Sequence, residues 1–307
     1  MTATLVFVLG GMLAAATPML FAAMGEVVAE RAGVLNLSVE GMMATGAATA
    51  FAAATLSGSH VFGFLAGGFA AGLLALVFGA LDLVFLANQV AAGLAVGILG
   101  LGISALVGKP FEGTTIAPLA RPDWFGLGSV PVIGPILFGR DIMVYLGVVL
   151  VAAVALVFAR TKLGLIVRAV GEAPHAARDI GYPVRLVRLA CVLTGGFLAG
   201  LGGAYLAIGY TALWAEGLVA GRGWIAVALV VFGSWLPLRI ALGAYVFGAI
   251  SLLELSLQSA GVQVPSQLLT ASPYLITIVV LAVISRDASR IRLNRPLALG
   301  QTYRNDA

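Results

Sequence analysis

The stretch TKLGLIVRAVGEAPHAARDIGYPVRLVRLACVLTGGFLAGLGGAYLAI, residues 161–208, decides the fold because it joins a basic loop to a long apolar run. The apolar part, residues 186–208, is long enough to cross a bilayer, which takes roughly 20 residues of helix. Eleven of the seventeen Lys and Arg residues lie beside this run or near the C-terminus. They are Arg160, Lys162, Arg168, Arg178, Arg185, Arg188, Arg286, Arg290, Arg292, Arg295 and Arg304. Short basic loops between spans are typical of the cytoplasmic side, so the stretch predicts both a membrane protein and its orientation.

The composition of the whole chain agrees with a membrane protein. Its 307 residues are 61% hydrophobic and only 10% charged, whereas soluble chains carry about 25% charged residues. Forty glycines favour the close helix packing on which membrane helices rely. The net charge of +4 follows the loops and does not form one patch, so we expect no binding to nucleic acid.

Nine apolar runs predict an all-α polytopic membrane protein with eight to ten transmembrane helices. The runs are residues 4–24, 34–56, 61–86, 88–108, 141–160, 186–208, 223–235, 240–260 and 273–285. The seventh and ninth are short, so either could be a half-helix. The first run lacks a basic segment before it and is too long for a signal-peptide core, so we expect a first span there.

The basic residues also predict the domain organisation and the sides of the loops. Residues 1–285 are expected to form a single transmembrane domain, with residues 286–307 as a basic cytoplasmic tail. If the loop 161–184 lies inside, then 209–222 and 109–140 lie outside and 24–33 lies inside. The N-terminus is then outside, unless one of the first four runs is re-entrant.

The segment ERAGVLNLSVEGMM, residues 30–43, places polar groups at the start of the second run. In a continuous helix, Glu40 would lie roughly 10 Å beyond Gly33 at about 1.5 Å per residue. A carboxylate at such depth usually faces protein or a water-filled cavity. Gly33 and Gly41 bracket the polar stretch, which favours an interrupted helix covered by protein or water.

The polar residues of this segment have two interpretations. Asn36, Ser38 and Glu40 could line a translocation path, or Glu40 could pair with Arg31 or a neighbouring helix to fix the packing. Glu254, deep in the eighth run, has the same two alternatives of lining the path or supporting the packing.

The segment GEAPHAARDIGYP, residues 171–183, predicts a short helix in the basic loop. Pro174 suits its first turn, Gly181 suits its end, and the acid Glu172 suits its start. A short helix with small side chains fits a groove on a soluble partner, and an ordinary capped loop helix is the alternative. The residues expected to shape it are Glu172, Ala176, Ala177 and Gly181.

The segment GRGWIAVALVVFGSW, residues 221–235, carries a tryptophan near each end of the seventh run. Trp224 and Trp235 are placed as interfacial anchors would be, and Arg222 begins the run from the outer side. Arg222 and Trp224 are therefore candidates for an outer gate, with membrane anchoring alone as the alternative.

The sequence offers no set of catalytic residues. His60 and His175 fall on opposite sides in the predicted topology, and Cys191 is the single cysteine, so neither a metal cluster nor a Ser-His pair can be assembled. The phosphate-binding pattern G-x-x-x-x-G-K-[ST] is absent. We therefore expect a transport subunit and no enzyme, with any ATP hydrolysed by another subunit.

Three segments carry a family resemblance. Residues 30–43 resemble the N-terminal signature of ABC-importer permeases of the nucleoside and simple-sugar branch, which is related to the ribose and branched-chain amino-acid permeases. Residues 221–233 resemble a second signature of that branch, and residues 172–181 resemble the coupling-helix motif of importer permeases. The resemblance covers residues from about 26 to 250 and implies a type II ABC importer permease fold.

The resemblance also implies a function and partners. The chain would form half of a translocation path for nucleosides, nucleobases or simple sugars, and nucleosides or nucleobases fit the first signature best. A second homologous permease, a cytosolic ATPase that uses ATP and Mg, and an extracytoplasmic substrate-binding protein would complete the importer. The chain itself would bind no cofactor. It would lie in the bacterial plasma (inner) membrane with a cytoplasmic C-terminus.

An ion-coupled secondary transporter is the alternative function. It would need ionisable residues near the middle of the membrane to couple ion movement. Glu40, Glu254 and Asp82 are the candidates that the apolar runs contain.

Overall fold

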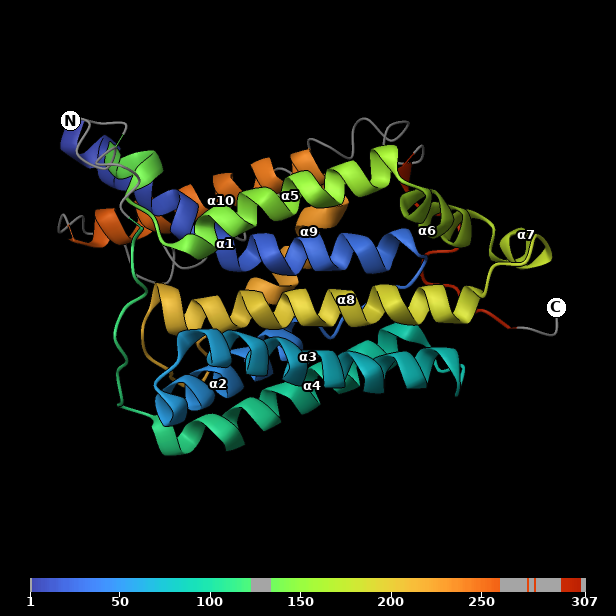
Figure 1. Ribbon diagram of the computed structural model, residues 1–307, viewed down its shortest axis with the longest axis horizontal. Helices are drawn as coiled ribbons and strands as arrows, with labels where there is room; N and C mark the ends of the chain where they lie inside the picture. Colours follow the sequence, from blue (N-terminus) through green and yellow to red (C-terminus); the bar gives the residue numbers. More distant parts are fainter. Residues whose placement is uncertain (1, 123–133, 260–274, 276–278, 280–293, 305–307) are drawn as a thin grey trace.

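The computed structural model describes residues 2–122, 134–259, 275, 279 and 294–304, which fold as a helical bundle (Figure 1). Its α-helices are α1 (Thr2–Arg31), α2 (Val39–Ser57), α3 (His60–Leu83), α4 (Gln89–Gly108), α5 (Ile142–Arg160), α6 (Lys162–Glu172), α7 (Pro174–Asp179), α8 (Val184–Ala204), α9 (Arg222–Phe232) and α10 (Pro237–Ser259). Shorter turns are η1 (Lys109–Phe111), η3 (Gly134–Phe138) and η4 (Tyr205–Tyr210). The predicted all-α class is confirmed.

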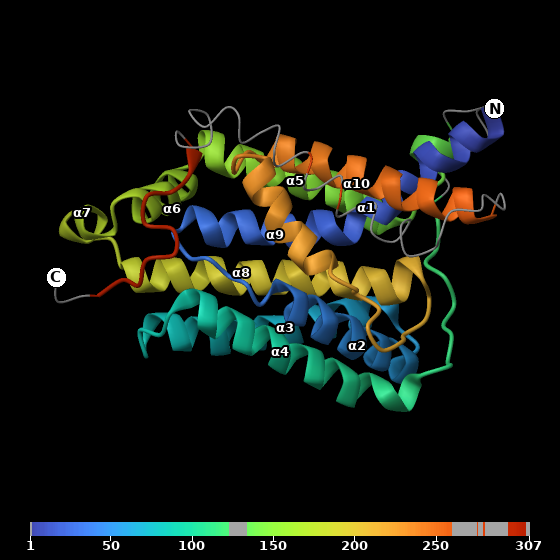
Figure 2. The ribbon, with the colours of Figure 1, turned by 180° about the vertical axis from the view of Figure 1, so that it is seen from behind.

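The long helices lie in layers along one axis (Figure 1). α1 and α8 lie in the middle, with α5 and α10 on one side and α2, α3 and α4 on the other, as the view from behind also shows (Figure 2). We call the end formed by α6, α7 and residues 294–304 the α7 end, and the opposite end the far end. The far end holds the α2–α3 turn, residues 111–116 and residues 211–213.

Five helices in the described part are long and apolar enough to cross a bilayer. They are Leu9–Arg31, His60–Leu83, Gln89–Phe111, Ile142–Arg160 and Val184–Tyr210. The last four agree within a few residues with the runs predicted in those places. Arg222–Phe232 and Pro237–Leu253 are shorter apolar helices, and the predicted run 273–285 lies outside the described residues apart from Leu275 and Val279.

Glycines on α8 bring two neighbouring helices almost into backbone contact. A Cβ atom on Gly203 would lie 1.9 Å from the carbonyl oxygen of Met43 in α2. A Cβ atom on Gly200 would lie 2.6 Å from the carbonyl oxygen of Gly67 in α3. Contacts between such small residues hold membrane helices together, because lipid offers no hydrophobic driving force for their association.

The outer faces of α3, α4 and α5 expose large apolar side chains. Phe69, Ile98 and Val149 are each more than half exposed. Apolar faces of this kind suit contact with lipid, where they need not be buried in protein.

Helix α1 is longer than the first apolar run predicts, because it continues past Met24 to Arg31. The hydropathy falls after Met24 since Glu26 and Glu30 follow, but both side chains are buried against protein and the helix continues. Arg31 in the last turn complements the partial negative charge of the helix end. Gly33, with a φ of +85°, lets the chain leave the helix.

The second predicted span is wrong at its start, because residues 32–38 form a buried, non-helical connector ahead of α2. The Leu35 N–H donates to Gln89 Oε1 at 2.8 Å, and the Asn36 N–H donates to Glu26 Oε1 at 3.1 Å. These bonds explain why non-helical backbone is tolerated inside the bundle, as the interrupted-helix prediction required. The connector runs from the α7 end to the middle, so α2 occupies the half toward the far end (Figure 2).

Helix α9 confirms that the seventh run is short. Its 11 residues measure about 16 Å at about 1.5 Å per residue, which is roughly half of a hydrocarbon core of about 30 Å. It begins in the middle of the bundle near the start of α2 and runs toward the α7 end, where α10 turns back (Figure 2). α2 and α9 are therefore two part-length helices that begin side by side.

The loops lie at the ends of the bundle in the pairs that the topology predicted. Gly33 and Gly171 are in contact at the α7 end, where the backbone of Ala298 also bonds to Gly171. Thr115 and Leu213 form an isolated antiparallel bridge at the far end. Which end faces the cytosol stays a prediction from the basic residues.

Candidate functional site

The carboxylate of Glu40 joins the starts of the two part-length helices. Its Oε1 accepts from the Gly221 N–H and its Oε2 accepts from the Gly223 N–H, both at 2.7 Å. A carboxylate at a helix N-terminus satisfies unpaired N–H groups and complements the helix dipole. Glu40 is thus bonded to a neighbouring helix, α9, and not to Arg31, while its place beside a translocation path stays a prediction.

Two glycines make this contact possible. Gly221 has a φ of +82°, which places its N–H toward Glu40 as the chain enters α9. A Cβ atom on Gly223 would lie 2.5 Å from Glu40 Cα, so a larger residue there would force α2 and α9 apart. The glycines of the GRG triplet are thus explained by backbone geometry.

Asn36 and Ser38 are buried and bond mainly to each other. Asn36 Oδ1 accepts from the Ser38 N–H at 3.0 Å and from the Ser38 hydroxyl, and Asn36 Nδ2 contacts Met42 Sδ at 3.5 Å. This turn ends the connector and leads into α2. Of the three path residues predicted in this segment, only Glu40 borders the cavity described below.

Trp235 is not an interfacial anchor, and that prediction is wrong. Its side chain is only 2% exposed, and its indole N–H donates to Glu30 Oε2. Its carbonyl accepts from Arg31 at 2.9 Å, and the Arg31 guanidinium also lies 5.9 Å from the Phe158 ring centroid. The physical reason is that α9 ends inside the bundle against α1. Trp224, by contrast, is 41% exposed.

Sequence reasoning missed the buried acids Glu26 and Glu30. They are one helical turn apart, so they lie on one face of α1. Both are at most 1% exposed, and each keeps one carboxylate oxygen without a hydrogen-bond partner in the described part of the chain. The spacing of four residues is a signal that the sequence contains, but the apolar run ends at Met24, ahead of both acids.

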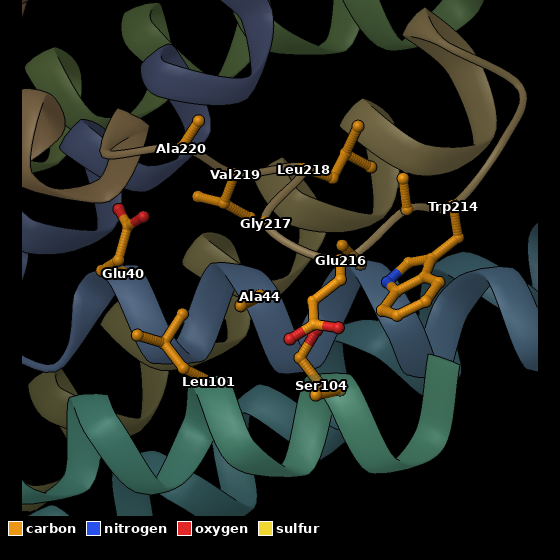
Figure 3. A pocket seen from close by; sticks show the side chains of 13 residues that line it. Glu40, Ala44, Leu101, Ser104, Trp214, Glu216, Gly217, Leu218, Val219 and Ala220 are labelled. Carbon is orange, nitrogen blue, oxygen red and sulfur yellow. The ribbon is translucent and has the colours of Figure 1, made fainter. Parts of the chain in front are cut away.

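A cavity of about 280 Å³ opens beside Glu40 (Figure 3). It lies between α2, α4 and residues 214–220, the segment that leads to α9. Arg222 supports that segment, because its guanidinium donates to the carbonyls of Leu218 and Val219 at 2.9 and 3.2 Å. The predicted gate residues Arg222 and Trp224 thus lie in α9 next to the cavity-lining segment.

Helix α7 projects beyond the end of α8 (Figure 1). Pro174 is its first residue and Gly181, with a φ of +96°, follows its end, both as predicted. Ala177 is buried against Val170 and Val184, whereas Ala176 and Gly181 are exposed. The short helix is therefore fixed to the bundle by one face and open on another.

Glu172 does not start this helix, and that prediction is wrong. It is the last residue of α6, because the amphipathic pattern of that helix continues to Glu172 and the chain turns only at Ala173. Its Oε2 accepts from the Leu297 N–H at 3.3 Å.

Comparison with known proteins identifies the family. Residues 5–285 match the family described as branched-chain amino acid transport system / permease component. The chain belongs to this permease family. A permease family agrees with the five described helices that are long and apolar enough to cross a bilayer.

Curated relatives of the permease are similar over nearly their whole length. TsgC13 of Haloferax volcanii, a protein named for the permease of a glucose ABC transporter, is 37% identical over 95% of this chain and 95% of its own. The guanosine ABC transporter permease NupQ of Bacillus subtilis is 31% identical over 87% of this chain and 88% of its own length. The nucleoside ABC transporter permease NupC of Lactococcus lactis is 31% identical over 91% of this chain and 92% of its own length. No solved structure matches the chain.

The C-terminal residues of the permease tie α6, α4 and α8 together at the α7 end. The Ala298 N–H donates to the Gly171 carbonyl at 2.9 Å, and the Gln301 carbonyl accepts from Arg188 at 3.2 Å and from Gln89 at 3.4 Å. Gln89 also donates to Asp82 at 3.2 Å. Arg286, Arg290 and Arg292 of the predicted tail lie outside the described residues.

Glu254 is the last of the predicted path residues. Glu254 lies in α10, where the structure describes the backbone and not its side chain. Across the described ranges, no group of three His, Cys, Asp or Glu side chains could hold a metal ion.

Proposed function

We propose that this chain is a membrane-spanning permease subunit of an ATP-driven importer for simple sugars or nucleosides, and that it forms half of the translocation path. The single observation that carries the proposal is α7, a short helix with one face packed on the bundle and another exposed beyond its end. The glucose, guanosine and nucleoside transporters to which the similar permeases belong support the choice of solute.

Coupling to a separate ATPase would use the exposed side of α7. Ala176 and Gly181 would enter a groove on the ATPase, because their small size leaves room for close approach. Ala177 would transmit the movement to Val170 and Val184 beneath it. Glu172 would support α7 from α6 through its bond to the C-terminal segment.

The translocation path would pass along the contact between α2 and α9. Glu40 holds their starts together, so movement of α9 relative to α2 would open or close the path at this depth. Asn36 and Ser38 would set the position of Glu40, with Glu254 contributing from α10. Arg222 and Trp224 would form the gate on the far-end side.

The complete importer would contain partners that this chain does not include. A second homologous permease would supply the other half of the path, a cytosolic ATPase would use ATP and Mg, and an extracytoplasmic protein would deliver the solute. The α7 end and the C-terminus would face the cytoplasm, as the basic loop predicts. The chain itself would carry no ATPase site.

The first test is purification of the tagged chain from its host in mild detergent, followed by reconstitution of the complex into liposomes. Recovery of an ATPase and a second permease, with uptake that requires ATP, is the expected result. Uptake that persists without ATP and disappears with an ion gradient would instead support the ion-coupled transporter.

A matched pair of variants tests the role of α7. Gly181→Arg places a large cation on the coupling face and is expected to abolish ATP-dependent uptake while the chain still reaches the membrane. Gly113→Arg is the control, because Gly113 also has a positive φ and open space around it but lies at the far end. Intact uptake and assembly in Gly181→Arg would show that α7 does not couple to the ATPase.

A further inference from the structure

The cavity beside Glu40 has the size of a small-solute site. Its volume of about 280 Å³ is close to the lower end of the range for small-molecule pockets, about 300–1,000 Å³. Ala44, Ala47 and Gly217 border it and keep it open, because none has a long side chain (Figure 3). A solute with one or two rings fits this space.

The wall formed by residues 214–220 is fixed at both ends. Trp214 is 2% exposed and packs so closely on α4 that a Cβ atom on Gly108 would lie 2.2 Å from its ring. At the other end, the Gly221 N–H is bonded to Glu40. A wall held in this way is preorganised, so binding would cost little additional ordering.

Two polar side chains point toward each other across the cavity. The Glu216 carboxylate extends from the loop toward the Ser104 hydroxyl on α4 (Figure 3). Neither side chain makes a hydrogen bond to any residue that the structure describes. Lys109 interacts electrostatically with Glu216, but it forms its ion pair with Glu112 at 3.0 Å.

The charges around the cavity restrict the chemistry of a bound solute. No Lys, Arg or His is among the described residues that line it. Both oxygens of Glu40 are already occupied by backbone N–H groups, which leaves the Glu216 carboxylate as a free acceptor. An anionic solute, or the carboxylate of an amino acid, would meet a negative charge and find no cation to bind.

Resting on the proposed function, we infer that this cavity is a solute site for an uncharged, polyhydroxylated ring, that is, a simple sugar or the ribose of a nucleoside. A carboxylate accepts hydrogen bonds from several hydroxyl groups at once, and such charge-assisted bonds are stronger than neutral ones. Glu216 accepts from the ring hydroxyls, and Ser104 donates to or accepts from the same ring. A solute arriving from the far end reaches this site before the contact between α2 and α9.

The test uses the complete complex in liposomes, with Cys191→Ser to remove the single cysteine of this chain and with the parent complex carrying Cys191→Ser alone as the background for labelling. Ser104→Cys is then labelled with a water-soluble methanethiosulfonate reagent. Saturating D-glucose or guanosine is expected to slow labelling at least about fivefold, while leucine and glucose 6-phosphate leave the rate unchanged. Ser57→Cys is the control, because Ser57 is exposed at the end of α2 outside the cavity and should label at the same rate with every solute.

A second pair of measurements tests the role of Glu216. Glu216→Gln is expected to lower the kcat/KM of ATP-dependent uptake about tenfold, because a charge-assisted bond becomes a neutral one. The loss should be smaller for an analogue that lacks a ring hydroxyl, such as 2-deoxy-D-glucose, so that the variant discriminates less between the two sugars. A merely structural role for Glu216 would lower the uptake of both sugars equally.

Each outcome separates the site from the transport function. ATP-dependent uptake without protection of Ser104→Cys overturns the site and leaves the function standing. Protection without ATP-dependent uptake supports the site and overturns the function. If the complex that carries Ser104→Cys fails to assemble, Leu101→Cys replaces it in the labelling experiment, because Leu101 lines the same cavity and is 44% exposed.

Discussion

The middle of the bundle and its α7 end differ in how completely their buried polar groups are hydrogen-bonded. In the middle, both oxygens of Glu40 are bonded, and Asn36 and Ser38 satisfy each other. Toward the α7 end, six buried side-chain atoms have no hydrogen-bond partner among the described residues. They are Glu26 Oε2, Glu30 Oε1, Asp82 Oδ1, the Nε and one terminal nitrogen of Arg188, and the Tyr303 hydroxyl.

The buried polar groups in the middle already have hydrogen-bond partners, whereas those toward the α7 end can still gain them. Buried polar groups are costly without partners, so a region that contains several of them gains most from bound water or from a second arrangement of its helices. The middle has no such gain to make. We therefore expect substitutions in the middle to act through lost bonds and packing, and those at the α7 end to act through charge.

The largest expected effect is at the α7 end. Arg188 is fully buried and interacts electrostatically with Asp82, so Arg188→Met leaves that carboxylate without its cation. Leaving a buried charge uncompensated costs about 3–5 kcal/mol, and thermal unfolding of the purified complex should show the loss. Arg185→Met, on the exposed side of the same helix, should be nearly neutral. Equal stability of the two variants would contradict this electrostatic interaction, and Asp82→Asn in the Arg188→Met background should restore most of the loss.

The next effect is in the middle. Glu40→Ala leaves the N–H groups of Gly221 and Gly223 without acceptors, which costs about 1–3 kcal/mol for the buried Gly223 N–H and less for the half-buried Gly221 N–H. Glu40→Gln should be intermediate, because its amide keeps one acceptor oxygen. Thermal unfolding measures the cost, and faster proteolysis between residues 214 and 221 would show release of the loop. A Glu40→Ala protein as stable as the parent would mean that these bonds do not hold α9.

A glycine pair separates packing from bonding in the middle. Gly203→Ala places a Cβ atom 1.9 Å from the Met43 carbonyl oxygen, and overpacking of this kind costs about 1–3 kcal/mol. Gly102→Ala, in open space on α4, should be neutral or slightly stabilising, because alanine favours helix. Opposite signs of the two changes in melting temperature are expected, and a shared sign would contradict the close approach of α8 to α2.

The smallest effect is at the surface of the α7 end. Glu172→Ala removes the acceptor of the Leu297 N–H, a bond of 3.3 Å at an exposed position. The cost in unfolding free energy should be below about 1 kcal/mol, and Glu172→Gln should restore it. A loss as large as that of Arg188→Met would mean that the C-terminal segment is a main support of the bundle.

The long helices could be predicted from the sequence because exposed apolar residues such as Phe69 and Ile98 are part of continuous apolar runs. The C-terminal end of α1 and the start of α2 could not be predicted. Glu26 and Glu30 lower the hydropathy, yet they are covered by residues far away in the sequence, and hydropathy contains no information on such contacts. For the same reason the sequence places Trp235 as an interfacial anchor, although its indole N–H is bonded to Glu30 inside the bundle.

The candidate site was predictable only in part. Glu40 is a candidate from the sequence because a carboxylate at that depth needs hydrogen-bond partners. Its partners are at a helix start 181 residues away in the sequence, which no local pattern reveals. The places of Pro174 and Gly181 at the two ends of α7 are predictable, since turn chemistry is local. Ser104 and Glu216 carry no local pattern, and only the path of the loop beside α4 brings them together.

The contact between the starts of α2 and α9 also restricts the order in which the protein is made. Glu40 emerges from the ribosome 181 residues before Gly221, a delay of roughly 10–40 s at about 5–20 residues per second. During that time a carboxylate and a non-helical connector destined for the bundle interior have no final partners. The first two helices must therefore wait in a hydrated or shielded environment, and the N-terminal half can complete its own fold only after α9 has been synthesised.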